Sequence, residues 1–216
     1  MPNKRFGFLL PNRRKIVNGT YNFVGYVLAF NPDDYKNKQK IRERLGYGQE
    51  SIIICTIGGT KIGQPLLQLC AESFSILREK IRNLRMVLIS GPRVVSSLLD
   101  VPKGIEVMEY IPNLYEHFAA CDLAIVQGGS TTTLELTALR QPFIYFPLEG
   151  HAEQQLHVAP RLERFNAGIK MQFSKTTPEM LAEKVISSLG KKVNYPSIPI
   201  NGAQNTVKII KQILAV

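Results

Sequence analysis

The sequence predicts an α/β protein with a doubly wound parallel sheet, and three observations support that fold class. Residues 52–57 form a continuous, mostly β-branched run, which is typical of a strand buried on both faces of a parallel sheet. Further short apolar runs alternate with helical patterns, as successive βα units require. Finally, residues 123–138 read as strand, glycine turn and helix in immediate succession.

Apolar periodicity and breaker residues place the elements in order. Asp33 and Asp34 are typical of a helix cap, and the charged helix that follows is expected to end near Leu45, before Gly46. The strands predicted after it are 52–57, 86–90, 105–110, 123–126 and 143–146. The predicted helices are 64–80, 114–120, one that opens after 131–133, 153–165, 178–189 with Thr177 as its cap, and 207–214.

Composition favours a globular protein of one main domain. The chain has 216 residues, of which 44% are hydrophobic and 20% charged, and it has no apolar run near the ~20 residues that span a bilayer. Residues 1–15 lack an uninterrupted signal-peptide core. The three cysteines, Cys55, Cys70 and Cys121, lie in apolar patterns without metal-ligand spacing. These features predict a cytoplasmic, reducing environment.

The formal charge of +10 is concentrated toward the N-terminus, where residues 1–50 carry ten basic and four acidic side chains. A basic surface attracts phosphate, anionic lipid or nucleic acid, although it also serves simply as a solvated face. The sequence has no nucleic-acid-binding motif and does not interleave aromatic with basic residues, so no nucleic-acid partner is expected. Peripheral contact with a membrane remains an open alternative.

The most informative motif is the turn at Gln127-Gly128-Gly129 and the helix start after it. Glycines let the backbone approach a ligand closely, and N–H groups at a helix N-terminus bind phosphate. The hydroxyls of Ser130, Thr131 and Thr132 would either cap the helix or donate to the phosphate. The next strand ends at Pro147 and leads to Glu153-Gln154-Gln155, so two polar loops are expected at one edge of the sheet.

These residues resemble the donor-binding signature of glycosyltransferases that have two facing Rossmann-like domains. In the UDP-glycosyltransferases the signature has a His-x-Gly turn, a Ser-Thr-x-Glu helix start, a Pro-bounded strand and an acid-Gln pair. The corresponding residues here are 127–129, 132–135, 141–147 and 153–154. Gln154-Gln155 is also similar to the Gln-Gln pair of the MurG-type enzymes, which do not require the His. The chain therefore resembles the Rossmann-like C-terminal half, the family 28 C-terminal domain.

The resemblance implies a role for each site residue. Gly128, Gly129 and the three hydroxyls would hold the pyrophosphate, and Glu135 would accept both ribose hydroxyls. Glu153, Gln154 and Gln155 would contact the sugar, while backbone groups near Ile111 would read the base. Gly58, Gly59 and Thr60 would form a second loop facing the cleft. For Glu135 and the 153–154 pair the alternative is a helix-start role, and for 58–60 it is a plain turn. His151 could touch phosphate or sugar, whereas His117 and His157 fit surface or packing roles.

The resemblance implies an inverting glycosyltransferase (a hexosyltransferase) with a UDP-sugar as donor substrate and no separate cofactor. No Asp-x-Asp motif is present, so catalysis without a bound metal is expected. Residues 1–32 would be a linker or the end of an N-terminal acceptor domain, and 33–216 the sugar-nucleotide-binding domain. No catalytic base is found, so the missing half would supply it, in cis or as a separate subunit. The alternatives are a donor-binding subunit of a split enzyme and a nucleotide-binding regulatory module; the acid-rich pattern of the related 2-epimerases is absent.

Overall fold

The computed structural model describes residues 22–59, 61–93 and 99–214, and these residues fall into two compact units. The larger unit is Phe30–Ser197, and the smaller one joins the segment that ends at Ala29 to the segment that begins at Ile198. Predictions made for Thr60 and for residues 1–21 therefore lie outside the described residues. The expectation that residues 1–32 end an acceptor domain stays a prediction.

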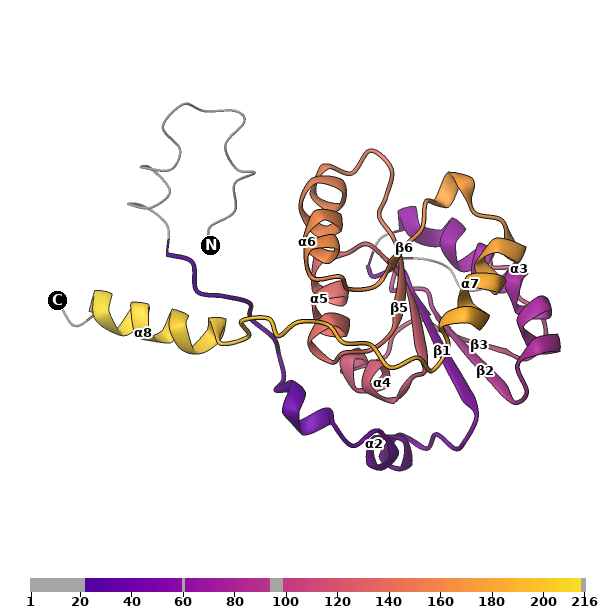
Figure 1. The fold of residues 1–216 in the computed structure, drawn as a ribbon, viewed down its shortest axis with the longest axis horizontal. Coiled ribbons are helices and arrows are strands. Elements are labelled where there is room, and N and C mark those ends of the chain that lie inside the picture. Colours follow the sequence, from indigo (N-terminus) through magenta and orange to yellow (C-terminus); the bar gives the residue numbers. More distant parts are fainter. Residues whose placement is uncertain (1–21, 60, 94–98, 215–216) are drawn as a thin grey trace. The chain divides into compact units, whose positions relative to one another are not determined.

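The larger unit is built on a six-stranded, wholly parallel sheet of order β3-β2-β1-β4-β5-β6 (Figure 1). The chain starts in the middle of the sheet and moves to one edge, then returns to the centre at β4 and builds toward the other edge. This order confirms the predicted doubly wound α/β fold. The strands are β1 (Ser51–Thr56), β2 (Leu84–Ile89), β3 (Ile105–Met108), β4 (Leu123–Gln127), β5 (Phe143–Phe146) and β6 (Ile169–Lys170).

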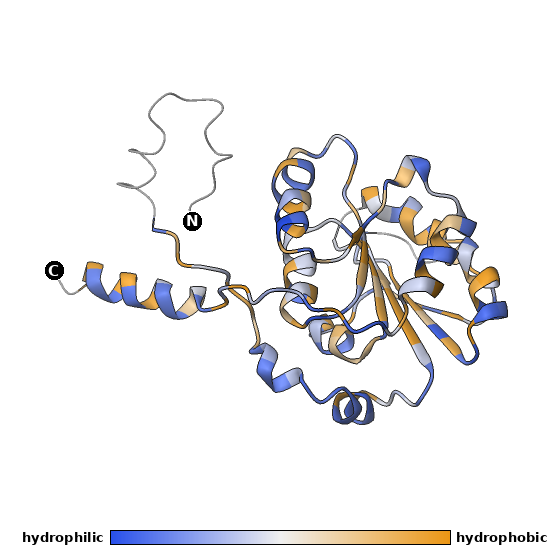
Figure 2. Ribbon diagram, in the orientation of Figure 1, coloured by the Kyte–Doolittle hydropathy of each residue, from blue (hydrophilic) through white to orange (hydrophobic). Residues whose placement is uncertain are grey.

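Helices cover both faces of the sheet, which explains why its central strands are apolar throughout (Figures 1 and 2). Phe118, Leu136 and Leu162 belong to the core on the face covered by α4, α5 and α6. Leu67 and Leu181 belong to the core on the other face, under α3 and α7. The helices are α2 (Lys38–Leu45), α3 (Gln64–Lys80), α4 (Leu114–Ala120), α5 (Ser130–Ala138), α6 (Ala159–Arg164) and α7 (Pro178–Ser188).

The structure differs from the sequence prediction at two helices. The expected helix over 33–45 is a short 3₁₀ turn, η2 (Pro32–Tyr35), followed by α2. Asn37 divides it, because its Oδ1 accepts from the Lys40 N–H at 3.0 Å and caps a separate helix. Asn31 caps η2 in the same way, since its Oδ1 accepts from the Asp33 N–H at 3.2 Å. The expected helix over 153–165 is a π-helical segment, η5 (Gln154–Val158), that continues into α6.

A partly buried ionic cluster holds α2 at the amino-terminal ends of β1 and β4. Asp122 accepts hydrogen bonds from Lys38 Nζ and Arg42 Nη2, each at 2.6 Å, and from the Ile52 N–H at 2.8 Å. Burial alone would raise the pKa of the Asp122 carboxyl, but these bonds together bring it below its usual value. The charged side chains of α2 are therefore anchors for the start of β1 and β4.

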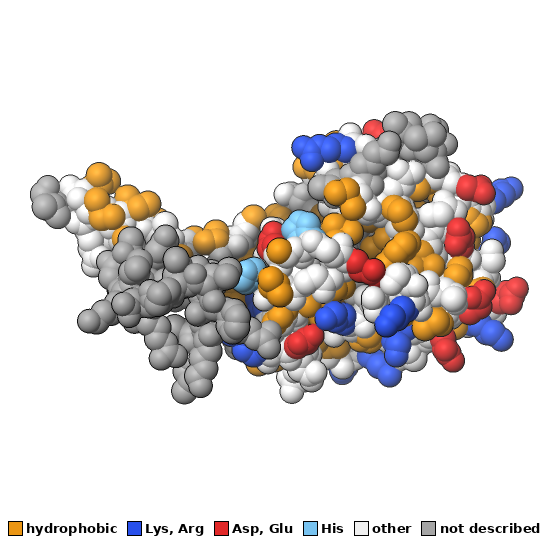
Figure 3. All heavy atoms as spheres, turned by 90° about the horizontal axis from the view of Figure 1, so that it is seen from above, with side chains coloured by type: hydrophobic (Ala, Val, Ile, Leu, Met, Phe, Trp, Pro, Cys, Tyr) orange, Lys and Arg blue, Asp and Glu red, His pale blue; other side chains and the backbone are white. Residues whose placement is uncertain are grey.

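The smaller unit consists of an extended segment paired with the chain that leads into α8 (Gly202–Leu214). The Tyr26 N–H donates to the Pro199 carbonyl at 2.8 Å, and the Gly202 N–H donates to the Tyr26 carbonyl at 3.0 Å. The helix predicted at 207–214 is confirmed and begins earlier. Figure 3 shows apolar side chains along α8. Val207, Ile210 and Ile213 of this helix are 50%, 48% and 67% exposed.

Candidate nucleotide-binding site

The N-terminus of α5 is an uncapped helix end at the carboxyl edge of the central strands. β4 ends at Gln127, and Gly129 occupies the cap position without any side-chain cap. Within the described part of the chain, the N–H groups of Ser130, Thr131 and Thr132 make no hydrogen bond, and the first helical bond runs from the Thr133 N–H to the Gly129 carbonyl at 3.2 Å. Three free donors at a positive helix end form a site for an anion such as a phosphate.

Close packing explains one glycine of this turn, and open space explains the other. A Cβ at Gly128 would lie 2.8 Å from Pro147 Cα, so a side chain there would push the loop after β5 away. A Cβ at Gly129 would meet nothing within 4 Å. The space in front of Gly129 is therefore free for a ligand to approach the backbone. The missing side chain of Gly128 lets the loops after β4 and β5 pack closely.

Glu135 lies on α5, one turn beyond Thr131, and it is partly buried. Burial raises the pKa of its carboxyl to about 7. Its side chain makes no hydrogen bond or ion pair to another described residue. A desolvated carboxyl without a partner next to an anion site is suited to accepting hydroxyl groups from a ligand.

The loop after β5 is held by both glutamines of the predicted sugar-binding group. Gln154 is buried, and its Oε1 accepts from the Leu148 N–H at 2.8 Å. Gln155 Nε2 donates to the carbonyls of Pro147 and Leu148, at 3.2 and 2.9 Å. Both side chains therefore reach the same loop, although the two residues are adjacent in the sequence. Glu153 is exposed.

The remaining predicted positions lie along the same edge of the sheet. Gly58 follows β1 and has a positive φ of 71°. Its carbonyl lies so close to Gly91 that a side chain at position 91 would clash with it. Arg93 Nη1 donates to the Gly59 carbonyl at 3.2 Å, which ties this first glycine loop to the loop after β2. Ile111 follows β3 with its side chain buried, so only its backbone could read a base.

His117 is partly buried, whereas His151 is exposed. His117 Nδ1 is 2.7 Å from the Tyr47 hydroxyl, and burial lowers the pKa of its imidazole. His151 is exposed at the loop after β5, where its Nδ1 lies 3.5 Å from the Gln154 N–H. The packing role expected for His117 agrees with this geometry.

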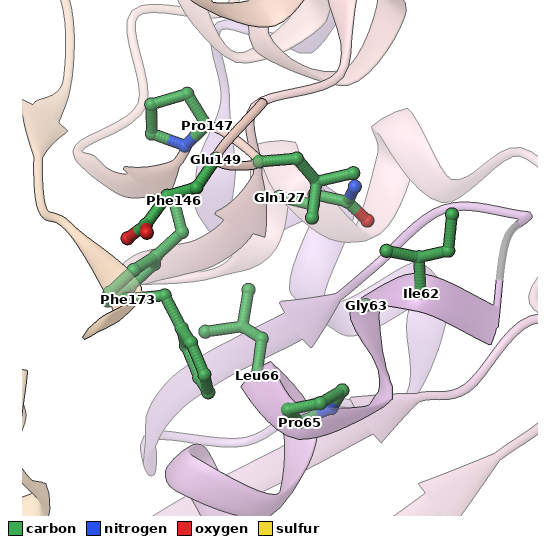
Figure 4. Close-up of a pocket in the computed structure, with 10 residues that line it drawn as sticks. Ile62, Gly63, Pro65, Leu66, Gln127, Phe146, Pro147, Glu149 and Phe173 are labelled. Atoms are coloured by element: carbon green, nitrogen blue, oxygen red, sulfur yellow. The ribbon is translucent and has the colours of Figure 1, made fainter. Parts of the chain in front are cut away.

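Gln127, at the position where the UDP-glycosyltransferase signature has His, borders an apolar pocket of about 200 Å³ (Figure 4). Gln127 is 7% exposed, and its Oε1 is buried without a hydrogen-bond partner among the described residues. The side chain points toward Gly63, where a Cβ would lie 2.6 Å from that oxygen. The pocket lies beside the turn at residues 127–129 and is otherwise lined mainly by apolar side chains: Ile62, Pro65, Leu66, Phe146, Pro147, Leu148 and Phe173.

Sequence reasoning missed Arg161. This residue of α6 donates from Nη1 to Ser130 Oγ at 3.3 Å and from Nη2 to Thr133 Oγ1 at 3.0 Å. Its position 31 residues after Ser130 forms no local motif, so only the packing of α6 on α5 reveals the contact.

The described residues hold no group of three or more His, Cys, Asp or Glu that could bind a metal ion.

Comparison with known families gives the class of protein that this fold and site define. Residues 53–213 match the model of the glycosyltransferase family 28 C-terminal domain. Because the match covers more than half of the chain, the protein belongs to that family, and the predicted resemblance is confirmed.

Individual relatives place the chain within this class. It is 28% identical to an uncharacterized glycosyltransferase of Methanopyrus kandleri, over 87% of this chain and 53% of that protein. It is 25% identical to the UDP-N-acetylglucosamine–N-acetylmuramyl-(pentapeptide) pyrophosphoryl-undecaprenol N-acetylglucosamine transferase of Carboxydothermus hydrogenoformans, over 82% of this chain and 47% of the relative. The chain thus spans about half the length of these relatives.

The crystal structure of Acinetobacter baumannii MurG shares the fold. The TM-score is 0.56 at 18% identity, over 86% of this chain and 55% of the MurG chain. The fold assignment to the C-terminal half of a two-domain glycosyltransferase is therefore confirmed. A search of the described helices finds none with the length and apolar character needed to cross a bilayer.

Proposed function

We propose that this domain binds the nucleotide-sugar donor, a UDP-sugar, of an inverting glycosyltransferase that works without a bound metal. The observation that carries the proposal is the uncapped N-terminus of α5 beside the unpartnered, desolvated Glu135. The diphosphate would accept hydrogen bonds from the N–H groups of Ser130, Thr131 and Thr132. Glu135 would accept the ribose hydroxyls, and the backbone at Ile111 would meet the base.

The same donors would assist the reaction. As the sugar leaves, negative charge grows on the diphosphate, and fixed N–H groups and the α5 dipole stabilise that charge. Gln154 and Gln155 would act mainly by fixing the loop after β5, since their side chains hydrogen-bond to its backbone. Glu153, which is exposed beside them, is the carboxylate available for a sugar hydroxyl.

The acceptor and the catalytic base would come from a second half, either in the same polypeptide or as a separate subunit. The chain spans about half the length of its relatives, and the two carboxylates that the described residues place beside the site, Glu135 and Glu153, would be occupied by ribose and sugar hydroxyls. The exposed apolar side of α8, with Val207, Ile210 and Ile213, is a surface that such a half could cover. We place the enzyme in the cytoplasm, with peripheral membrane contact if the acceptor is a lipid.

A thermal-shift screen with UDP, GDP, TDP and their sugars tests the proposal, because a ligand that binds only the folded state raises the melting temperature. UDP compounds are expected to give the largest shift. The full chain alone should transfer sugar at a negligible rate, because without a bound acceptor the gain from proximity, ~7–11 kcal/mol of barrier, is lost. Binding of UDP together with full activity of the chain alone would instead place the base within these 216 residues.

A nucleotide-binding regulatory module is the second candidate. It shares the α5 anion site but predicts that no acceptor half restores transfer. Adding the N-terminal half of a family member in trans, with a labelled UDP-sugar, separates the two: product formation supports the enzyme, and UDP binding without product supports the module.

A further inference from the structure

The side chain of Arg161 forms hydrogen bonds with the first turn of α5. Its guanidinium donates from Nη1 to Ser130 Oγ at 3.3 Å, and from Nη2 to the Ser130 carbonyl at 3.1 Å and to Thr133 Oγ1 at 3.0 Å. Two of these three acceptors belong to Ser130, whose N–H and hydroxyl face the proposed diphosphate. The planar fork of an arginine holds its acceptors in one fixed geometry, whereas the ammonium of a lysine is a point donor without that geometry.

The contact continues from Thr133 to the glycine turn. Thr133 is fully buried, and its Oγ1 donates to the Gly129 carbonyl at 2.7 Å while it accepts from Arg161. The hydroxyl proton of Thr133 is thus used inside the loop. Ser130 Oγ, by contrast, accepts from Arg161 and keeps its own proton available to donate to a ligand. Arg161 therefore sets the orientation of the turn and of one phosphate-facing hydroxyl.

The positive charge of Arg161 lies at the N-terminus of α5, where the helix dipole disfavours a cation. The N-terminus of a helix carries about half a positive charge, so acidic residues are the usual neighbours there. The first turn of α5 has no acidic residue, and a guanidinium lies against it instead. Two positive charges in contact repel each other in the empty domain, and both attract an anion that binds between the free N–H groups.

We propose that Arg161 is a positioning residue for the diphosphate of the donor: it fixes Ser130 and the glycine turn through its fork and adds positive charge to the site. The inference rests on the proposed function, since it assumes a nucleoside diphosphate at the α5 N-terminus. It assigns to α6 a part in donor binding that the glycine motif alone does not contain.

The test compares Arg161→Gln with Arg164→Gln, a matched control on the same helix with the same change in charge. Arg164 is exposed and lies over the Phe165 ring, and it makes no hydrogen bond to α5 among the described residues. Each full-length variant is titrated with UDP and with uridine, which lacks the phosphates. Arg161→Gln is expected to weaken UDP at least tenfold and uridine less than twofold, while Arg164→Gln leaves both within twofold of wild type.

The outcomes separate this inference from the proposed function. Wild type that binds no UDP overturns both. Wild type that binds UDP, with Arg161→Gln binding it equally well, overturns only the role of Arg161, as does an equal loss of UDP and uridine affinity, because that pattern indicates a structural role. If Arg161→Gln does not fold, Arg161→Lys takes its place: it keeps the charge but not the fork, and UDP affinity equal to wild type would contradict the positioning role.

Discussion

The ionisation of Glu135 gives a sharp test of the proposed ribose contact. Burial raises the pKa of this carboxyl to about 7, and a carboxylate accepts two hydroxyl protons whereas the protonated acid does so poorly. Between pH 6 and pH 8 the ionised fraction rises from about 10% to about 90%. Since the apparent affinity scales with the competent fraction, the affinity for a UDP-sugar should rise about tenfold over this range.

The assay is a calorimetric titration with UDP-N-acetylglucosamine at pH 6, 7 and 8. Both phosphates of this donor are esterified, so it lacks the phosphate ionisation near pH 6 that free UDP would add. Two controls isolate Glu135: the Glu135→Gln variant, and a 2′,3′-dideoxy donor on wild type. Both should show a pH-independent and weaker affinity. An equal pH dependence in Glu135→Gln, or a flat profile in wild type, would refute the ribose role.

The same carboxyl should affect stability in the opposite direction. Because its pKa is higher in the folded state, the folded domain is penalised as pH rises from about 4.5 through 7. A full shift of this size corresponds to about 3 kcal/mol, which partial exposure reduces to about 1–2 kcal/mol. Without ligand, Glu135→Gln should therefore be more stable than wild type at pH 8 and similar to it at pH 4.5, as measured by urea unfolding.

Three further substitutions test the framework of the site. Asp122→Asn should lower the free energy of unfolding by about 2–4 kcal/mol at pH 7, because Arg42 is left buried without its charge partner; this difference should shrink as the pH falls through the lowered pKa of Asp122. Gly128→Ala should lower stability by about 1–3 kcal/mol, since the added methyl overlaps Pro147. Gly129→Ala should leave the melting temperature unchanged, because its Cβ meets nothing, yet weaken UDP binding more than tenfold by blocking the phosphate. A Gly129→Ala variant that binds UDP normally would argue against a ligand in front of that turn.

Much of the fold could be predicted because the signals are local and strong. Residues 52–57 are almost entirely β-branched and form the centre of the sheet, and Thr177 caps α7 as expected, since its hydroxyl accepts from the Met180 N–H at 3.3 Å. The edge strand β6 has only two residues, too few to give an apolar pattern. The π-helical η5 also has no sequence signature, because its i→i+5 bonds depend on how the chain packs against the loop after β5.

The site was predicted where residues act through backbone and helix geometry, and less well where they act through packing. Gly128, Gly129 and the α5 N-terminus follow directly from the strand–turn–helix pattern. The bracing of residues 147–148 by Gln154 and Gln155 depends on tertiary contacts across six to eight residues. Arg161 depends on contacts across 31 residues, and no spacing rule identifies such a partner.

The most direct test of the central claim is a backbone NMR titration of the full chain with UDP. The largest amide shifts are expected at Ser130, Thr131 and Thr132, with smaller shifts at Glu135. The amides of Ser188 and Tyr195 serve as the control and should remain unchanged. These residues line a second pocket beside Pro142, at the start of β5 and away from the α5 N-terminus. Shifts centred on those residues, or no shift at millimolar UDP, would contradict a nucleotide site at the α5 N-terminus.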